Sequence, residues 1–341
     1  MRSVFSFLAF VSVAGAAPLL DYPTANRAIT SGESEEFYQY VDRYFGGEKS
    51  QPWEGGQFGY VRTPRVIDGT VVYTRMHEGI DIKPLNRDAD GHPTDPILAS
   101  AAGTVAYVND SPGGSNYGRY VVVTHRAAGS DYYTLYAHLA SVAVEAGDAV
   151  EQGQTLGIMG YSGRGLDRTR AHVHFEFALM MSEHFNGWHA EVYRPGINPH
   201  GNFNGQNLAG INPAELLVAA AAEPDTFSLE DFLRSQPIHY KIAIPASPSF
   251  TLHERYPWML EGDDSDARAW EVGFTQYGAP VRVAAMDETL TEPRVTFVKP
   301  TEIPIIRATN GVVGGTAGHP ELTNSGKRKA ALLTQGPSDP E

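Results

Sequence analysis

Two histidines separated by one residue form the strongest chemical feature of the chain. They lie in residues 171–177, AHVHFEF, where polar and apolar residues alternate. Side chains two positions apart on a β-strand project from the same face, so His172 and His174 would stand ~7 Å apart while the apolar residues between them face a core. A metal site and a pair of surface histidines on a half-buried strand both fit this pattern.

A histidine and an aspartate four residues apart form a second candidate. The stretch His77-Glu78-Gly79-Ile80-Asp81 approaches the helical His-Glu-x-x-His zinc motif, but an aspartate replaces the second histidine. The glycine and the alternation at 80–82 instead predict a turn that enters a strand. His77 and Asp81 would then be able to converge on one ion, because nitrogen and carboxylate donors suit zinc and a remote imidazole would complete three ligands. A solvated histidine and a turn aspartate fit the same residues.

A third candidate is His138, in Tyr136-Ala137-His138-Leu139, directly after a predicted strand at 132–136. Taken singly, this residue is typical of a strand-end histidine whose hydrogen bonds are satisfied. His138 becomes a candidate because this motif stands in order along the chain with the other two motifs.

The elements that position these residues are predicted to be short strands. From about Gly56 to Ala178 the chain is rich in β-branched and aromatic residues, interrupted by Gly, Pro, Asn or Asp. The predicted strands are 71–73, 80–82, 103–108, 120–124, 132–136, 155–159 and 173–177. Because no helical period separates them, the sequence predicts a mainly β fold with an antiparallel sheet or barrel.

The flanking regions are predicted to add helices. A short helix is expected at 35–45, ended by Gly46-Gly47, and residues 182–210 are expected to form a long loop. Asn212 and Pro213 predict the start of one helix, and Ser228 is the expected cap of another. Strands expected at 240–244, 270–274, 281–284 and 295–298 give an α+β C-terminal extension, with a tail after Gly314 that is ordered only in part.

Composition excludes several classes of protein. The chain has 341 residues and a formal charge of −14, with 26 Lys and Arg against 40 Asp and Glu, and it contains no cysteine. The acidic balance argues against a nucleic-acid partner. The absence of cysteine excludes disulfides, cysteine-ligated zinc, thiol catalysis and iron–sulfur clusters.

The N-terminus is predicted to be an export signal. A positive start at Met1-Arg2-Ser3, an apolar run at 4–13 and Ala14-Gly15-Ala16 form the pattern of a signal peptide at 1–16. The run is too short for a membrane span, and we expect no transmembrane segment in the mature chain. The expected location is therefore periplasmic or extracellular.

The order of the three motifs resembles the LytM/lysostaphin-type zinc metallopeptidases, which cut peptide cross-links in bacterial cell walls. His-x-x-x-Asp at 77–81, Tyr-Ala-His-Leu at 136–139 and His-x-His-Phe-Glu at 172–176 carry the resemblance, which runs from about Gly56 to Leu217. It includes Gly59-Tyr60-Val61-Arg62 and the closing Asn212-Pro213.

The resemblance implies roles for five residues and a barrel-like β domain. His77, Asp81 and His174 take the positions of the ligands of one Zn²⁺ ion, and His138 and His172 take those of two catalytic histidines. Which of the two is the base and which stabilises the oxyanion stays open. The implied activity is hydrolysis of peptide bonds in peptidoglycan stems by an exported metalloendopeptidase.

Two other interpretations compete with this one. A catalytically silent module of the same type would bind cell wall or activate other wall hydrolases, but silent members usually lose ligand or catalytic positions, and all five are present. Residues 144–156 also resemble the turn of lipoyl and biotinyl carriers, which need a lysine at the hairpin tip. The chain has none between Lys83 and Lys241, which excludes the carrier.

The predicted organisation is a signal peptide at 1–16, an N-terminal segment at 17–55, a zinc peptidase domain at 56–222 and an extension of unknown role at 223–341. Residues 17–50 are hypothesised to pack across the groove and hold the enzyme latent. Arg164, Arg168 and Arg170 are candidates for gripping a substrate carboxylate. His184, His189 and His200 are expected at the surface, and Glu78 and Glu176 are assigned no role.

Overall fold

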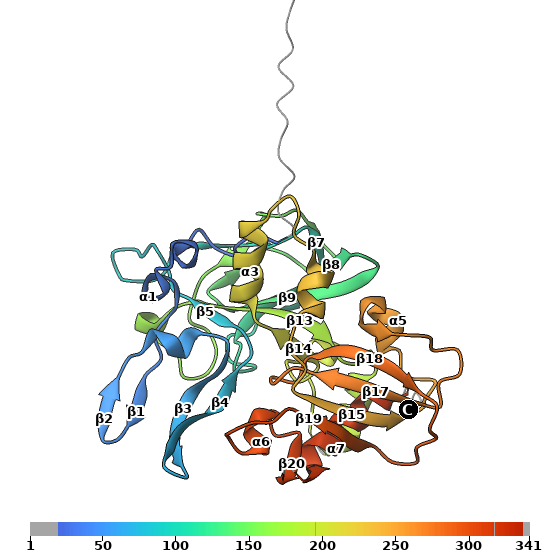
Figure 1. Ribbon diagram of the computed structural model, residues 1–341. Coiled ribbons are helices and arrows are strands. Elements are labelled where there is room, and N and C mark those ends of the chain that lie inside the picture. The colour runs from blue at the N-terminus through green and yellow to red at the C-terminus, as the bar shows by residue number, and fades with distance from the viewer. Residues whose placement is uncertain (1–19, 195, 317, 337–341) are drawn as a thin grey trace, which may run out of the picture.

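The computed structural model describes residues 20–194, 196–316 and 318–336. The predicted signal peptide lies outside these residues. The described chain is mainly β, with antiparallel sheets, and this confirms the predicted fold class (Figure 1).

A seven-stranded antiparallel sheet carries Asp81, His138 and His174. Its strands lie in the order β11-β7-β8-β9-β13-β14, and β5 pairs with the first part of β13. The strands are β5 (Ile80–Ile82), β7 (Gly103–Asn109), β8 (Arg119–Ala127), β9 (Ser130–Leu139), β11 (Ala149–Val150), β13 (Val173–Met180) and β14 (Leu208–Ile211).

Smaller elements surround this sheet. A three-stranded sheet contains β6 (Pro96–Leu98), β10 (Ser141–Val142) and β12 (Thr155–Ile158). Two hairpins, β1 (Arg43–Phe45) with β2 (Glu48–Ser50) and β3 (Gly59–Ile67) with β4 (Thr70–His77), project to one side in Figure 1. The helices of this part are α1 (Ser34–Phe37), α2 (Phe185–Val192) and α3 (Pro213–Ala222).

The C-terminal extension has a sheet of its own and is α+β, as predicted. Its strands lie in the order β16-β18-β17-β15-β19, and a further hairpin joins β20 to β21. The elements are α4 (Leu229–Arg234), β15 (Tyr240–Pro245), α5 (Leu252–Arg255), β16 (Leu260–Glu261), β17 (Ala269–Phe274), β18 (Pro280–Met286), β19 (Arg294–Val298), α6 (Ile305–Ala308), β20 (Val313–Thr316), β21 (His319–Leu322) and α7 (Asn324–Thr334).

The alternation on β13 decides which side chains meet the core. Val173, Phe175 and Phe177 are buried in the larger core, to which α3 contributes Leu216. The opposite face of the sheet carries a smaller apolar cluster that includes Met180. The histidines at 172 and 174 share the face of Met180, because side chains alternate along a strand.

Both predicted helix caps are confirmed. The Asn212 side chain accepts a hydrogen bond from the Ala214 N–H, with Pro213 in the first turn of α3. The Ser228 side chain accepts one from the Asp231 N–H at the start of α4. Such caps satisfy N–H groups that have no partner within the helix.

The predicted helix at 35–45 is wrong beyond Phe37. The chain is extended there because it pairs with β5. The Gln39 N–H donates to the Asp81 carbonyl (2.8 Å), and the Lys83 N–H donates to the Phe37 carbonyl (3.0 Å). Residues 37–39 thus line the free edge of β5 and support the strand that carries Asp81. Gly46-Gly47 does not end a helix; both glycines have positive φ and form the turn between β1 and β2. That this segment inhibits the enzyme stays a prediction.

The predicted long loop at 182–210 is also wrong. Helix α2 lies within the loop region because Phe185 and Trp188 are buried, and the Trp188 indole N–H donates to the Arg328 carbonyl of α7. In the predicted tail, helix α7 packs by burying Ala330, Leu332 and Leu333, while residues 317 and 337–341 lie outside the described residues. Each of these segments is held by contacts with residues far away in the sequence.

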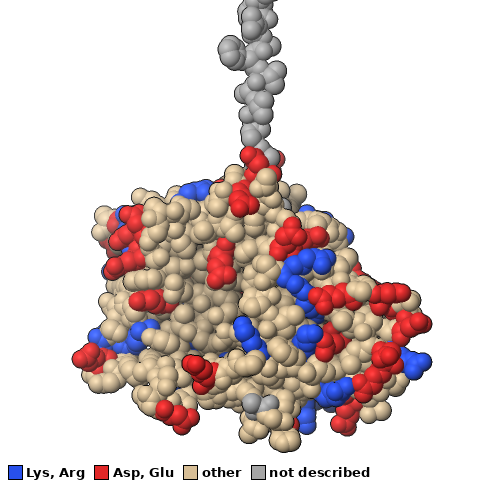
Figure 2. Space-filling view, in the orientation of Figure 1, with Lys and Arg blue, Asp and Glu red and all other residues tan. Residues whose placement is uncertain are grey.

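The surface mixes charges of both signs. Figure 2 shows acidic and basic side chains interspersed over this face, with acidic ones frequent on the side of the C-terminal strands. Among the described residues, no helix combines the length and the apolar character that crossing a membrane requires.

Candidate metal centre

Three elements bring His77, Asp81 and His174 together. His77 ends β4, and Asp81 lies directly opposite His174 in the antiparallel pairing of β5 with β13. The turn between them needs Gly79, because a Cβ at this position would collide with the Phe175 carbonyl oxygen. The predicted turn into a strand is therefore confirmed, and the glycine lets β4 and β5 approach β13.

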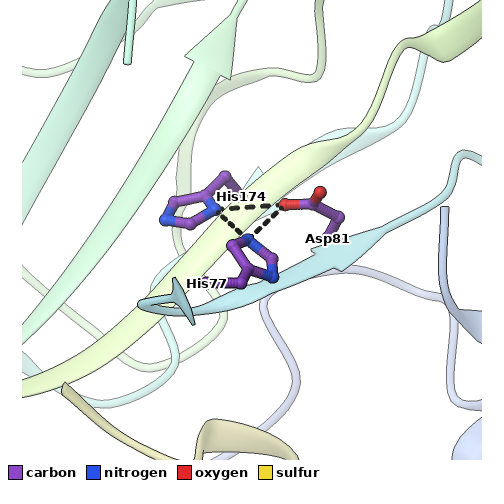
Figure 3. Close-up of side chains that lie close together, drawn as sticks. All are labelled: His77, Asp81 and His174. Atoms are coloured by element: carbon purple, nitrogen blue, oxygen red, sulfur yellow. Dashed lines mark hydrogen bonds and ion pairs between the residues drawn. The ribbon is translucent and has the colours of Figure 1, made fainter. Parts of the chain in front are cut away.

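The three side chains point at one another (Figure 3). His77 Nε2 lies 3.0 Å from Asp81 Oδ1, and His174 Nδ1 lies 3.1 Å from the same oxygen. The two nitrogens are 2.9 Å apart. All three residues are almost fully buried, with 2%, 2% and 5% of their surfaces exposed. One ion could therefore contact all three donor atoms at once.

The hydrogen bonds on the far sides of both rings show that a cation fits this position. His77 Nδ1 donates to the Gln57 carbonyl (2.7 Å), and His174 Nε2 donates to Glu176 Oε1 (2.8 Å). In the neutral imidazoles the two facing nitrogens therefore both carry lone pairs, beside a carboxylate oxygen. Nitrogen lone pairs at 2.9 Å repel unless a proton or a metal ion lies between them.

Electrostatics leads to the same conclusion. Burial lowers the pKa of His77 to about 4. Burial acts on His174 as well, but hydrogen bonds to Asp81 and Glu176 outweigh it and raise its pKa to about 9. Burial opposes ionisation of Asp81 too, yet His172, His77 and Arg62 hold its pKa well below the usual value. Positive charge is therefore favoured where the three donors converge, and a divalent cation would supply it there.

His138 and His172 lie beside this cluster. Their rings are 4.8 Å apart, and His172 Nε2 is 3.3 Å from Asp81 Oδ1. His172 Nδ1 donates to the Arg170 carbonyl (2.7 Å), and His138 Nδ1 donates to the Ser162 carbonyl (2.9 Å). In the neutral form of each ring the lone pair is therefore on Nε2. Burial, with the neighbouring imidazoles of His172 and His174, holds the pKa of His138 well below its usual value, so this ring is neutral and can accept a proton.

The backbone of His138 is in an unusual conformation. Its φ is 64°, in the left-handed region that few non-glycine residues occupy. Its N–H donates to the Tyr117 carbonyl (2.9 Å), which holds this strained geometry at the end of β9. Strain of this kind costs about 1–3 kcal/mol and persists where the surroundings enforce it.

Three further residues complete the cluster. Glu176 is fully buried and holds the His174 ring, and its Oε1 also accepts from the Tyr117 hydroxyl (2.5 Å). Arg62 donates to Asp81 Oδ2 (2.5 Å). The period of two places Glu176 on the face of His174, so the sequence already held a signal for it. Tyr117 and Arg62 reach the site only through tertiary contacts.

The other candidates have different surroundings. Arg170 orients His172 through its carbonyl rather than its charge, while Arg164 and Arg168 are exposed. The prediction that His189 and His200 lie at the surface is wrong; they are 8% and 9% exposed, because His189 packs on Tyr193 and His200 bonds the Tyr107 hydroxyl. His184 is half-buried.

Replacing Glu176 with glutamine tests how the His174 ring is held. The amide keeps the size and an acceptor oxygen, but the negative charge that strengthens the His174 donor bond is lost. Loss of such a partner weakens metal binding about 10–100-fold. We expect a drop in this range in Zn²⁺ affinity, measured by competition with a chromophoric chelator. The matched variant Glu145→Gln, at an exposed position, should bind as the unaltered chain does; equal affinities for all three proteins would show that Glu176 does not orient the ligand.

Comparison with known proteins agrees with this geometry. The profile of peptidase family M23 matches residues 75–186. The chain is 34% identical over 113 residues to an uncharacterized metalloprotease of Haemophilus influenzae, covering 33% of this chain and 19% of that protein. It is 36% identical over 84 residues to the peptidoglycan DD-endopeptidase ShyA of Vibrio cholerae, covering 25% of this chain and 17% of that protein. These matches span less than a fifth of either relative.

A shorter relative is covered over most of its length. The lipoprotein NlpD of Yersinia enterocolitica is 33% identical over 89 residues, which are 26% of this chain and 82% of that protein. Among solved structures, the catalytic domain of the antimicrobial peptidase lysostaphin from Staphylococcus simulans aligns at 20% identity over 52% of this chain and 92% of that chain, with a TM-score of 0.30.

Proposed function

Since the chain belongs to peptidase family M23, we propose that it is a zinc metalloendopeptidase that hydrolyses peptide bonds in the cross-links of peptidoglycan. The observation that supports this most directly is the convergence of His77, Asp81 and His174 beside two further histidines. Two nitrogens and one carboxylate oxygen form a donor set that zinc favours, and three protein ligands are typical of catalytic rather than structural zinc sites.

The roles proposed for the chain's own residues follow from their hydrogen bonds. A zinc ion bound by the three ligands would supply Lewis acidity, which polarises a carbonyl oxygen and lowers the pKa of water. His138 and His172, each with a lone pair on Nε2, are placed to accept a proton from the attacking water and to donate it to the amine that leaves. In its protonated form either ring can also stabilise the oxyanion of the tetrahedral intermediate.

The substrate class rests on the relatives. ShyA of Vibrio cholerae is named a peptidoglycan DD-endopeptidase, and the same name is given to ShyC of that organism. We propose peptide stems of peptidoglycan as the substrate, and a location outside the cytoplasm, where the predicted signal peptide would direct the chain.

Digestion of purified cell-wall sacculi tests the activity. We expect the full chain with Zn²⁺ to release soluble peptide-bearing fragments, identified by mass spectrometry, and a chelator to reduce the release to background. Returning Zn²⁺ should restore it, because the ligands lie on strands that remain paired. Release that continues at the same rate in chelator would contradict a metal-dependent reaction.

A silent module of the same family is the second candidate. It would bind sacculi and Zn²⁺ but release nothing from them, and His138→Ala would leave wall binding unchanged. A co-sedimentation assay beside the digestion separates the two, since the enzyme must give fragments that the variant does not.

A further inference from the structure

A cavity of about 390 Å³ lies between the peptidase part and the C-terminal extension. The ends of β4 and β14 form one wall, and residues after β17, before β20 and in α7 form the other; Figure 1 shows β14 at this boundary. Glu78, Tyr117 and Tyr193 line it from the first side, and Asn310, Arg328 and Lys329 from the second. The volume lies within the range usual for small-molecule sites, which occur preferentially between domains.

One end of the cavity carries an ammonium group whose charge no acid of the described chain compensates. Lys329 Nζ donates to the Gly278 carbonyl (2.6 Å) and lies 5.2 Å from the centre of the Phe274 ring. No carboxylate within the described ranges forms an ion pair with it. Burial lowers its pKa to about 8, as expected where no anion offsets the loss of water.

Other donors surround Lys329. A Cβ built on Gly278 would meet Lys329 Nζ, the Tyr240 hydroxyl and the Asn310 amide nitrogen, so these three groups lie around one point. The Tyr240 hydroxyl is buried, and it has no hydrogen-bond partner in the part of the chain described. Arg328 lines the same cavity, and its guanidinium lies over the ring of Tyr193, 5.6 Å from the ring centre. This end therefore offers donors and positive charge to an anion.

The opposite wall carries carboxylates. Glu78 lines the cavity, and the Tyr117 hydroxyl, which also lines it, donates to the fully buried Glu176. Glu176 Oε2 is buried without a hydrogen-bond partner among the described residues. This wall therefore favours a cationic group.

We propose that this cavity binds the zwitterionic form of a short peptide or amino acid, with its ammonium group toward Glu78 and its carboxylate toward Lys329. A charge-assisted hydrogen bond at each end would fix the orientation, while Tyr277 and Met76 supply apolar contact between them. The site is separate from the metal-binding cluster and goes beyond the proposed peptidase function. Tyr117 connects the two, because it lines the cavity and hydrogen-bonds Glu176.

Calorimetric titration with alanyl-alanine tests the site. The full chain is titrated at pH 7 with Zn²⁺ and again in chelator, so that binding at the metal is separated from binding in the cavity. We expect one dipeptide per chain in both conditions. Acetylation of the dipeptide's amine or amidation of its carboxylate should each weaken binding about tenfold or more, since each removes a charged hydrogen bond.

Variants locate the two ends of the ligand. Lys329→Met should weaken binding of the dipeptide and abolish the preference for the free acid over the amide. Glu78→Gln should abolish the preference for the free amine over the acetylated amine. Lys327→Met and Glu145→Gln, at exposed positions, should behave as the unaltered chain. Failure of the dipeptide to bind in chelator, or unchanged preferences in both cavity variants, overturns the proposal. Neither result bears on the proposed peptidase function, which the digestion of sacculi tests separately.

Discussion

Replacing Asp81 with asparagine is expected to remove both the bound metal and the hydrolytic activity while the fold persists. The Asp81 carboxylate is the common partner of His77, His174, His172 and Arg62. An amide keeps the shape but removes the negative charge that attracts a divalent ion. Loss of a group that only orients a ligand costs about 10–100-fold in affinity, and we expect loss of the ligand itself to cost on the order of 10³-fold or more.

Zinc content after dialysis, measured by atomic emission, and fragment release from sacculi give the two readouts. Asp95→Asn is the matched control, because Asp95 is also 2% exposed and accepts hydrogen bonds from the N–H groups of Leu85 and Asn86, away from the cluster. It should lower the melting temperature and leave zinc content unchanged. Stoichiometric zinc in the Asp81 variant, or equal zinc loss in both variants, would argue against the assigned ligand set.

Local spacing predicted the local geometry of the site residues but not which of them meet across the sheet. His172 and His174 follow from the period of a strand, and the glycine between His77 and Asp81 excludes a helix. The pairing of Asp81 with His174 did not follow from spacing, because it depends on two strands some ninety residues apart in the chain. The order of the three motifs supplied that information through the family resemblance.

The groups that orient the ligands were harder to predict. Glu176 lies on the correct face of its strand, but only the structure shows its carboxylate between His174 and Tyr117. Arg62 lies on a hairpin that crosses to Asp81; the family resemblance includes Gly59-Tyr60-Val61-Arg62 but gives Arg62 no contact with Asp81. Hydrogen bonds of this kind hold a site in its working geometry, and they come from residues whose types are common in any sequence.

The errors in secondary structure have the same physical origin. Residues 38–45 have a helical pattern of aromatic side chains, yet Tyr38 bridges to Ile82 and Gln39 bonds Asp81. Helix α2 is short and rich in Asn, Gly and His, and its stability comes from burying Phe185 and Trp188. In each case tertiary contacts outweighed intrinsic propensity, as they commonly do for short elements.

His138→Asn is expected to abolish hydrolysis without loss of metal or stability. The imidazole is lost, and a general acid or base contributes about 10²–10⁴-fold to the rate. The three ligands are untouched, so zinc content should stay at one ion per chain. The φ of 64° suits asparagine better than most residues, so the melting temperature should not fall. The measurements are initial rates on sacculi, zinc content and thermal unfolding.

Two comparisons make this result specific. His138→Ala removes the same ring but places alanine in the left-handed region, so it should be equally inactive and less stable by about 1 kcal/mol. His125→Asn alters a buried histidine of β8 that bonds Thr134 and the Ala102 carbonyl, so it should be less stable and still active. An active His138→Asn variant would transfer the proton-transfer role to His172 alone. The rate then depends on a single imidazole, and His172→Asn would abolish hydrolysis by itself.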